Sequence, residues 1–207
     1  MFPCVGLVIS GGHTALVRIS DYDKIKLLGQ TRDDAAGEAF DKVAKVLNLG
    51  YPGGPAVEKE ADKGAETFID FPKAYLEKGS LDFSFSGIKT AVIYYLKNIK
   101  KEGKRVRKKD IAASFQKAVF DVIIDKSILA CKNNNAGQLL AGGGVTANRY
   151  FQKKLKAGTQ KQGIEVIFPA PDMCTDNAAM IAGLGFHLYK KGLKDDYTLT
   201  AEPYLGI

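Results

Sequence analysis

Two glycine-containing segments occupy positions where a phosphate or a nucleotide could bind. The first, Ser10-Gly11-Gly12-His13, separates the apolar runs 5–9 and 15–17, which are typical of β-strands. Two glycines remove Cβ and permit positive φ, so backbone N–H groups can converge on an anion, and Ser10 adds a hydroxyl donor. The alternative is an ordinary hairpin turn that needs glycine for its dihedral angles.

The second segment, Gly142-Gly143-Gly144, lies between the short apolar run 139–141 and a predicted helix over 145–157. A strand, a glycine loop and a helix in this order suit a ligand, because the helix N-terminus favours an anion or an acceptor group. Asn148, one turn into that predicted helix, could donate a hydrogen bond to a ligand. The alternative is a tight turn between strand and helix. The segment is not a Walker A loop, because no Gly-Lys-Ser or Gly-Lys-Thr follows.

Carboxylates recur at helical spacing in DDAAGEAFDK, residues 33–42. Asp34, Glu38 and Asp41 are spaced i, i+4, i+7 and therefore share one face of a helix. Such a group could accept hydrogen bonds from ribose hydroxyls, although a solvated helix face has the same pattern. Asp33 and Asp34 also suit the N-terminus of the helix that they are predicted to begin.

Asp176 lies in Cys174-Thr175-Asp176-Asn177, at the start of the last predicted helix. It is either an N-cap or a carboxylate ligand of a metal ion. The chain has only two histidines, His13 and His187, so the residues alone do not indicate a complete metal centre. No Ser-His-Asp set and no HExxH motif supports a protease.

Two further segments carry polar groups. FSFSGIKT, residues 83–90, predicts a helix that Ser86 caps, with Phe83 and Phe85 packed at its entry. A ligand contact through Ser84 or Lys89 is the alternative. Residues 97–110 contain eight Lys or Arg in fourteen positions and form either a solvated connection or a surface for phosphates.

The periodicity of the chain predicts an α/β fold. We expect strands at 5–9, 15–17, 24–31, 139–141 and 164–168, and helices at 33–47, 55–64, 86–101, 110–132, 145–157 and 175–190. Three hairpin-connected strands followed by strand–helix crossovers give a mixed sheet with helices on both faces. This is the ribonuclease-H-like layout of the actin-like ATPases. We assign 1–50 and 136–207 to that domain, and 51–135 to a mainly helical insertion.

The composition is that of a globular protein, with 45% hydrophobic and 26% charged residues in 207. No apolar run approaches the ~20 residues needed to cross a bilayer, and the start has no basic region of a secretory signal. Three widely spaced cysteines argue against a disulfide framework and a CxxC metal site, and they favour a reducing compartment. We therefore expect a cytoplasmic protein with no membrane partner. The net charge of +7 is compatible with an anionic partner.

Five ordered motifs, SGGHTALV, DDAAGEAFDKVAKVLNLGYPGGP, FSFSGIKTA, AGGGVTANR and CTDNAAMIA, closely resemble the tRNA adenosine threonylcarbamoyltransferase family, once labelled O-sialoglycoprotein endopeptidases. The resemblance covers essentially the whole chain. It implies a two-lobed actin-like ATPase fold. It also implies transfer of a threonylcarbamoyl group from threonylcarbamoyl-AMP to N6 of the adenosine beside the tRNA anticodon.

The resemblance also implies site residues. An adenylate or ATP would be held at its phosphate and acyl region by Val8, Ile9, Ser10, Gly11 and Gly12. The ribose would contact Asp41, Gly54 and Glu58, and the adenosine would contact Asn148. Asp176 matches a ligand of the family's one divalent metal per subunit, iron or zinc. The glycine bends near residues 11 and 143 should then line a single adenylate cleft.

One departure concerns the metal, because the family's other ligands come from an HxxxH motif in an N-terminal lobe and no HxxxH occurs here. The chain resembles the C-terminal lobe and should need the other lobe to act. The alternative is a non-catalytic actin-like module that binds a nucleotide or a partner. Besides tRNA, the resemblance implies a smaller actin-like paralogue and a P-loop ATPase as partners, and an uncovered cleft face also favours a homodimer.

Overall fold

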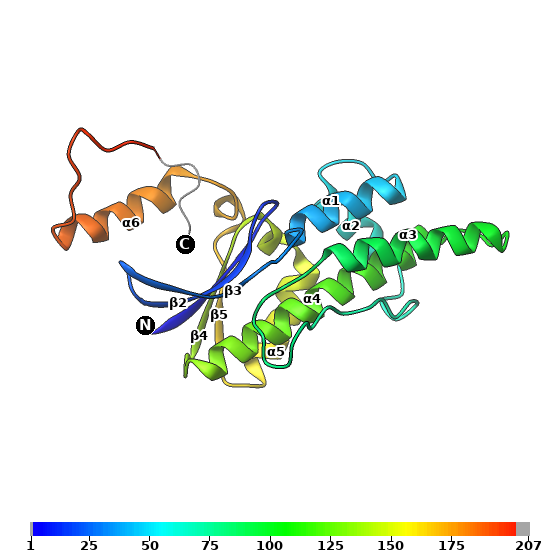
Figure 1. Cartoon of the computed structure of the whole chain (residues 1–207), viewed down its shortest axis with the longest axis horizontal. Helices are drawn as coiled ribbons and strands as arrows, with labels where there is room; N and C mark the ends of the chain where they lie inside the picture. The colour runs from blue at the N-terminus through cyan, green and yellow to red at the C-terminus, as the bar shows by residue number, and fades with distance from the viewer. Residues whose placement is uncertain (1, 202–207) are drawn as a thin grey trace.

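A computed structural model describes residues 2–201 and has a five-stranded mixed sheet flanked by helices (Figure 1). The strands are β1 (Cys4–Ile9), β2 (Thr14–Asp21), β3 (Lys24–Gln30), β4 (Gln138–Gly142) and β5 (Glu165–Ile167). Their order is β3-β2-β1-β4-β5; β2 is antiparallel to both neighbours, whereas β4 is parallel to β1 and β5. The predicted mixed α/β sheet is confirmed.

The helices follow the predicted order with shifted ends. They are α1 (Ala36–Leu47), α2 (Gly53–Ala61), α3 (Ser86–Lys101), α4 (Lys108–Asn133), α5 (Arg149–Gln160) and α6 (Ala178–Lys190), with 3-10 turns η1 (Gly144–Ala147) and η2 (Pro171–Met173). Among residues 2–201, no helix combines the length and apolar character that crossing a bilayer requires.

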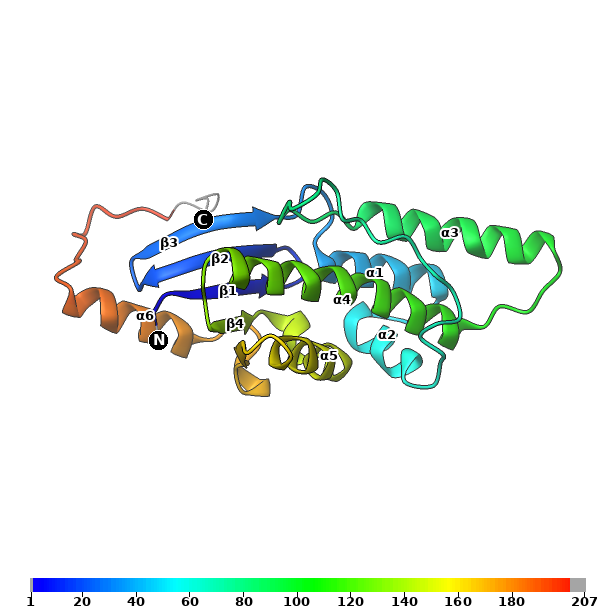
Figure 2. The same cartoon turned by 90° about the horizontal axis from the view of Figure 1, so that it is seen from below.

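One face of the sheet and the helices share a continuous core. Val5, Leu7 and Ile9 alternate along β1, so they point to the same side, and all three are buried. There they join the apolar side chains of α4, which contacts both β1 and β4. Figure 2 shows α4 running along the sheet and continuing past its edge between α1 and α2. The division into a sheet domain and the insertion 51–135 stays a prediction.

The start of α1 differs from the prediction. The helix was predicted to begin at Asp33 and Asp34, but it begins at Ala36, whose N–H donates to Thr14 Oγ1 at 2.9 Å. The Asp33 carboxylate instead accepts from the N–H groups of Phe85 (2.8 Å) and Ser86 (3.3 Å), at the N-terminus of α3. The predicted capping of α3 by Ser86 is also wrong, because Ser86 is its first residue and donates its hydroxyl to Asp33. An aspartate distant in sequence therefore caps α3.

Two asparagines begin the last helices. The predicted helix over 145–157 is divided, because η1 comes first and Asn148 is the N-cap of α5, accepting from Phe151 N–H at 2.9 Å. Asn148 therefore precedes the helix and does not lie one turn inside it. Similarly, Asn177 and not Asp176 caps α6, accepting from Met180 N–H at 3.1 Å.

Helix α6 lies apart from the other helices and has no buried residue (Figure 1). Its C-terminal end is attached to the β2–β3 hairpin, where Lys191 pairs with Asp21 and Asp23, and His187 stacks on Tyr22 with ring centroids 3.7 Å apart. Several large apolar side chains of this helix are exposed, namely Met180, Ile181, Leu184, Phe186 and Tyr189.

Candidate functional site

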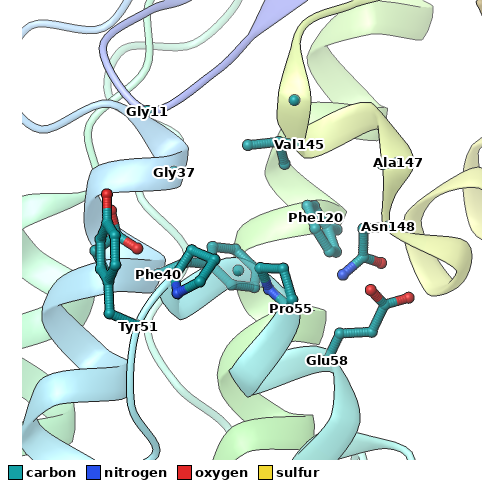
Figure 3. A pocket seen from close by; sticks show the side chains of 14 residues that line it. Gly11, Gly37, Phe40, Tyr51, Pro55, Glu58, Phe120, Val145, Ala147 and Asn148 are labelled. Carbon is teal, nitrogen blue, oxygen red and sulfur yellow. The ribbon is translucent and has the colours of Figure 1, made fainter. Parts of the chain in front are cut away.

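The two glycine bends meet because of the sheet topology. Strands β1 and β4 are parallel neighbours with Val8 opposite Gly142, so the segments that leave their carboxyl ends emerge at the same edge. Gly11, after β1, and Gly144, after β4, line one cavity of about 310 Å³ (Figure 3). The prediction that both bends border a shared hollow is confirmed.

Close backbone contacts hold the bends together. The N–H of Gly37 in α1 donates to Ser10 O at 3.1 Å, and a Cβ on Gly37 would lie 2.6 Å from that oxygen. Gly143 has φ +96°, and a Cβ there would lie 2.3 Å from Ile9 O. Both positions therefore need glycine for packing, and Gly143 needs it for its backbone conformation as well.

The first bend uses its glycines differently. Neither Gly11 nor Gly12 adopts the positive φ that glycine permits, and a Cβ on either would meet no atom within 4 Å. The Ser10 Oγ accepts from the N–H groups of Gly12 (3.3 Å) and His13 (3.0 Å), so this hydroxyl oxygen stabilises the turn itself. Since packing does not require glycine here, the bare backbone leaves room for a ligand.

Two predicted carboxylates border the cavity and cap helices with one oxygen each. Asp41 Oδ1 accepts from Gly53 N–H at 2.7 Å, at the start of α2, and Glu58 Oε1 accepts from Arg149 N–H at 2.6 Å, at the start of α5. Because each carboxylate has a second oxygen, each can still accept a hydrogen bond from a ligand hydroxyl.

The expected group of three carboxylates is divided in the structure. Asp34 and Glu38 bind Lys42, with Nζ–oxygen distances of 2.6 and 2.8 Å, and neither lines the cavity. Of these three carboxylates, only Asp41 lines the cavity. The ion pairs explain the difference, because Lys42 of α1 neutralises both Glu38 in the same helix and Asp34 just before it.

Asn148 is 7% exposed and is held at both ends of its amide. Its Oδ1 caps α5, and its Nδ2 donates to Gln116 Oε1 at 2.9 Å. Nδ2 carries a second hydrogen that remains available to a ligand. Sequence reasoning missed Gln116, which is only 2% exposed; a glutamine among the inward-facing residues of α4 was the available signal.

Aromatic side chains that sequence analysis did not select form much of the cavity wall. Phe40 and Phe120 contact each other with ring centroids 5.2 Å apart, and Val145 and Pro55 extend the apolar lining. Figure 3 shows Asn148 and Glu58 beside each other on one side and Tyr51 on the opposite side. An apolar wall with a few polar groups, at a volume near the lower end of the usual ~300–1,000 Å³, is typical of small-molecule sites.

Not every predicted site residue lines the cavity. Gly11, Asp41, Gly54, Glu58 and Asn148 do, whereas Val8, Ile9, Ser10 and Gly12 belong to the adjoining end of β1 and its bend. Their ligand roles stay predictions.

Asp176 is exposed in the segment between η2 and α6. This segment reaches the second bend, because Thr175 Cγ2 would lie 3.9 Å from a Cβ on Gly144. Within residues 2–201, no three His, Cys, Asp or Glu side chains are grouped as metal ligands. A catalytic zinc site uses about three protein ligands, so the described residues do not fit a resident metal by themselves.

Comparison with known proteins places this geometry in context. The model of a family described as TsaD, tRNA N6-adenosine threonylcarbamoyltransferase, matches residues 1–183. Curated proteins of that name from Dictyoglomus turgidum and Thermosipho africanus are each 49% identical over 99% of the chain. The chain spans 60% and 62% of their lengths.

Solved structures share the fold at low sequence identity. Full-length HypF in a phosphate- and nucleotide-bound form superposes with a TM-score of 0.66 at 13% identity, over 96% of this chain and 34% of that one. HypF from T. kodakarensis gives 0.60 at 16% identity, over 84% of this chain and 21% of that one.

Proposed function

This chain belongs to the tRNA N6-adenosine threonylcarbamoyltransferase family, and we propose that it supplies the adenylate-binding lobe of such an enzyme. The reaction is transfer of the threonylcarbamoyl group from threonylcarbamoyl-AMP to N6 of the adenosine adjacent to the tRNA anticodon. Because the chain spans about 60% of the curated relatives, we propose that catalysis requires a second lobe.

The observation that carries the proposal is the convergence of five predicted ligand residues on one cavity of about 310 Å³. They come from four separate parts of the chain, and sequence alone did not require them to meet. We propose that the ribose hydroxyls donate to the free oxygens of Asp41 and Glu58. The second Nδ2 hydrogen of Asn148 is directed to the adenosine, and the bend at Gly11 accommodates the phosphate and acyl region.

The chemistry asks mainly for positioning, because the adenylate is an activated donor. The N6 nitrogen attacks the carbamoyl carbon, a C–N bond forms, the bond from that carbon to the phosphate oxygen breaks, and AMP leaves while the amine releases a proton to solvent. Holding donor and adenosine in contact in the reacting geometry can remove about 7–11 kcal/mol of the barrier in such reactions. Phe40 and Phe120 exclude water from one wall of the cavity.

For the metal, we propose that Asp176 supplies one ligand to an iron or zinc ion and that an HxxxH motif of the second lobe supplies the others. Support comes from the closeness of the Asp176 segment to the second glycine bend. A metal held there would supply charge stabilisation beside the phosphate.

We propose tRNA as the acceptor and a cytoplasmic location, where tRNA is modified. A smaller actin-like paralogue and a P-loop ATPase are the proposed partner subunits. A homodimer is the alternative assembly. The exposed apolar side chains of α6 support a contact with another protein surface, because clustered apolar groups seldom remain in water.

Titration of the chain with AMP by calorimetry tests the binding site. Asp41→Asn keeps an acceptor for Gly53 N–H, so α2 stays capped, but it removes the charge that faces the ribose. A hydrogen bond to a charged group contributes about 1.5–3 kcal/mol, so we expect about 10- to 100-fold weaker binding. Asp62→Asn, at the exposed end of α2, is the matched control and should bind normally. Equal affinity of both variants would contradict the proposed ribose contact.

Catalysis is tested separately. The chain, a separately expressed N-terminal lobe, threonylcarbamoyl-AMP and unmodified tRNA are mixed, and modified adenosine is measured by mass spectrometry of the digested RNA. Product that requires both lobes supports the enzyme. Normal AMP binding without product under these conditions would favour the non-catalytic nucleotide-binding module.

A further inference from the structure

The basic segment 97–110 is the largest feature that the adenylate site leaves unexplained. It carries eight basic and two acidic residues, a surplus of six positive charges in a chain whose net charge is +7. It forms the end of α3, the connection 102–107 and the start of α4. Figures 1 and 2 both show this connection at the end of the molecule opposite α6.

Most of these charges are available to a partner. Within residues 2–201, Lys104 pairs with Glu102 at 2.8 Å and Arg107 pairs with Asp110 at 2.5 Å. The other six basic side chains form no ion pair in that part of the chain, and all six are exposed: Lys97, Lys100, Lys101, Arg105, Lys108 and Lys109. Like charges this dense repel one another, so an anionic partner would relieve the repulsion.

The basic side chains border hollows and not a flat surface. One hollow of about 590 Å³ lies between Glu60 of α2 and the run 105–109. A second, of about 310 Å³, has an apolar floor from α1, α3 and the connection, with Lys97, Lys100 and Lys108 among its lining residues. Val106 and Lys108 line both hollows, so the two adjoin.

A third hollow lies between this region and the adenylate cavity. It measures about 460 Å³ and is lined by the end of α1 and the loop after it. It shares Asn48 with the apolar hollow, and it shares Asp41 and Tyr51 with the adenylate cavity. Four neighbouring hollows with overlapping linings therefore lie in a row, which we call the basic track, from the adenylate cavity past Lys45 to the α3–α4 connection.

We propose that the basic track binds the phosphate backbone of the RNA substrate and directs it toward the adenylate cavity. The inference rests on the proposed function, because it takes RNA as the acceptor. Exposed lysines and arginines along a groove match a regularly charged backbone, and the apolar floor near Lys100 can receive an unstacked base. A flat anionic membrane does not follow a concave path that leads into a cavity, so an RNA fits the observations better.

The test measures binding of a fluorescent, unmodified tRNA transcript to the full chain by anisotropy, at salt concentrations from about 50 to about 400 mM. The track variant combines Lys100→Gln, Arg105→Gln and Lys108→Gln. The control removes the same number of positive charges elsewhere, by Lys24→Gln, Lys26→Gln and Lys161→Gln on β3 and after α5, where all three side chains are exposed. Circular dichroism establishes that both variants are folded.

Each phosphate contact contributes about 0.7–0.9 to the slope of log affinity against log salt, so losing three should reduce that slope by about 2 to 3. At about 100 mM salt the track variant should then bind on the order of 100-fold more weakly, while the control binds nearly as the wild type does. An equal loss in both variants, or no loss in the track variant, would overturn the proposal. So would a wild-type chain that fails to bind the transcript, or one that prefers phosphatidylserine vesicles to it.

AMP titration of the same proteins separates this inference from the proposed function. The substituted residues do not line the adenylate cavity, so AMP affinity should be unchanged in the track variant. Normal RNA binding without AMP binding would count against the adenylate site alone. Normal AMP binding without RNA binding would count against the basic track alone.

Discussion

Replacing Gly143 by alanine should separate the structural role of one glycine bend from the ligand-binding role of the other. Gly143 has φ +96°, and a Cβ there would lie 2.3 Å from Ile9 O, which is backbone and cannot rotate away. A left-handed conformation costs a non-glycine residue about 1–2 kcal/mol, and overpacking costs about 1–3 kcal/mol more. We therefore expect Gly143→Ala to lower the free energy of unfolding by about 2–5 kcal/mol.

Gly11→Ala is the matched control within the same cavity. A Cβ on Gly11 meets no atom within 4 Å, and its φ is not positive, so the free energy of unfolding should stay within about 0.5 kcal/mol. The new methyl group would project where the bend borders the cavity, so AMP binding should weaken by about 10-fold, or about 1.4 kcal/mol.

Urea unfolding and calorimetric AMP titration measure the two effects. For a chain of this length, a loss of 2–5 kcal/mol should lower the midpoint of thermal unfolding by about 5–20 °C. The reasoning is refuted if Gly143→Ala unfolds like the wild type, or if Gly11→Ala is the less stable of the two. It is also refuted if Gly11→Ala binds AMP with unchanged affinity, because the open bend would then have no ligand role.

Two further predictions concern titratable groups. Burial opposes ionisation of Asp33, but hydrogen bonds from Ser84, Phe85 and Ser86 outweigh it and lower the pKa of this carboxyl. A lowered pKa contributes stability that is fully present above the ordinary pKa of about 4 and is lost as the pH falls from there through the lowered value. Asp33→Ala should therefore cost about 1 kcal/mol in urea unfolding at pH 7, and this cost should shrink progressively as the pH is lowered below about 4; a cost that stays constant over that range would contradict the capping role. Burial is the larger cause that raises the pKa of the Cys131 thiol to about 11, and the nearby Cys4 is the smaller one. Iodoacetamide at pH 8 should therefore leave Cys131 unlabelled until urea unfolds the chain, and rapid labelling of the native protein, read by mass spectrometry, would contradict this.

The local pattern of the chain determined its elements. Alternating apolar residues predicted β1, and helical spacing predicted α1 and α4, because these signals depend on which side chains face a core within one element. The preference of glycine for turns located both glycine bends, because this signal is also local in the sequence. Helix ends were less well predicted, since Thr14 and Asp33, distant in sequence, satisfy the first turns of α1 and α3.

The site itself depended on the tertiary structure. Parallel pairing of β1 with β4 brings Gly11 and Gly144 to one cavity, and packing of α1 on α4 makes Phe40 and Phe120 its wall. Helical spacing placed Asp34, Glu38 and Asp41 in one group. The contacts with Lys42 and Gly53 then showed that, of the three, Asp41 is the carboxylate that remains available to a ligand. The spacing of residues along the chain determines which way the side chains of one element point. The pairing of distant strands depends instead on how much apolar surface the whole molecule removes from water. That second condition is global, and it decided which residues share the cavity.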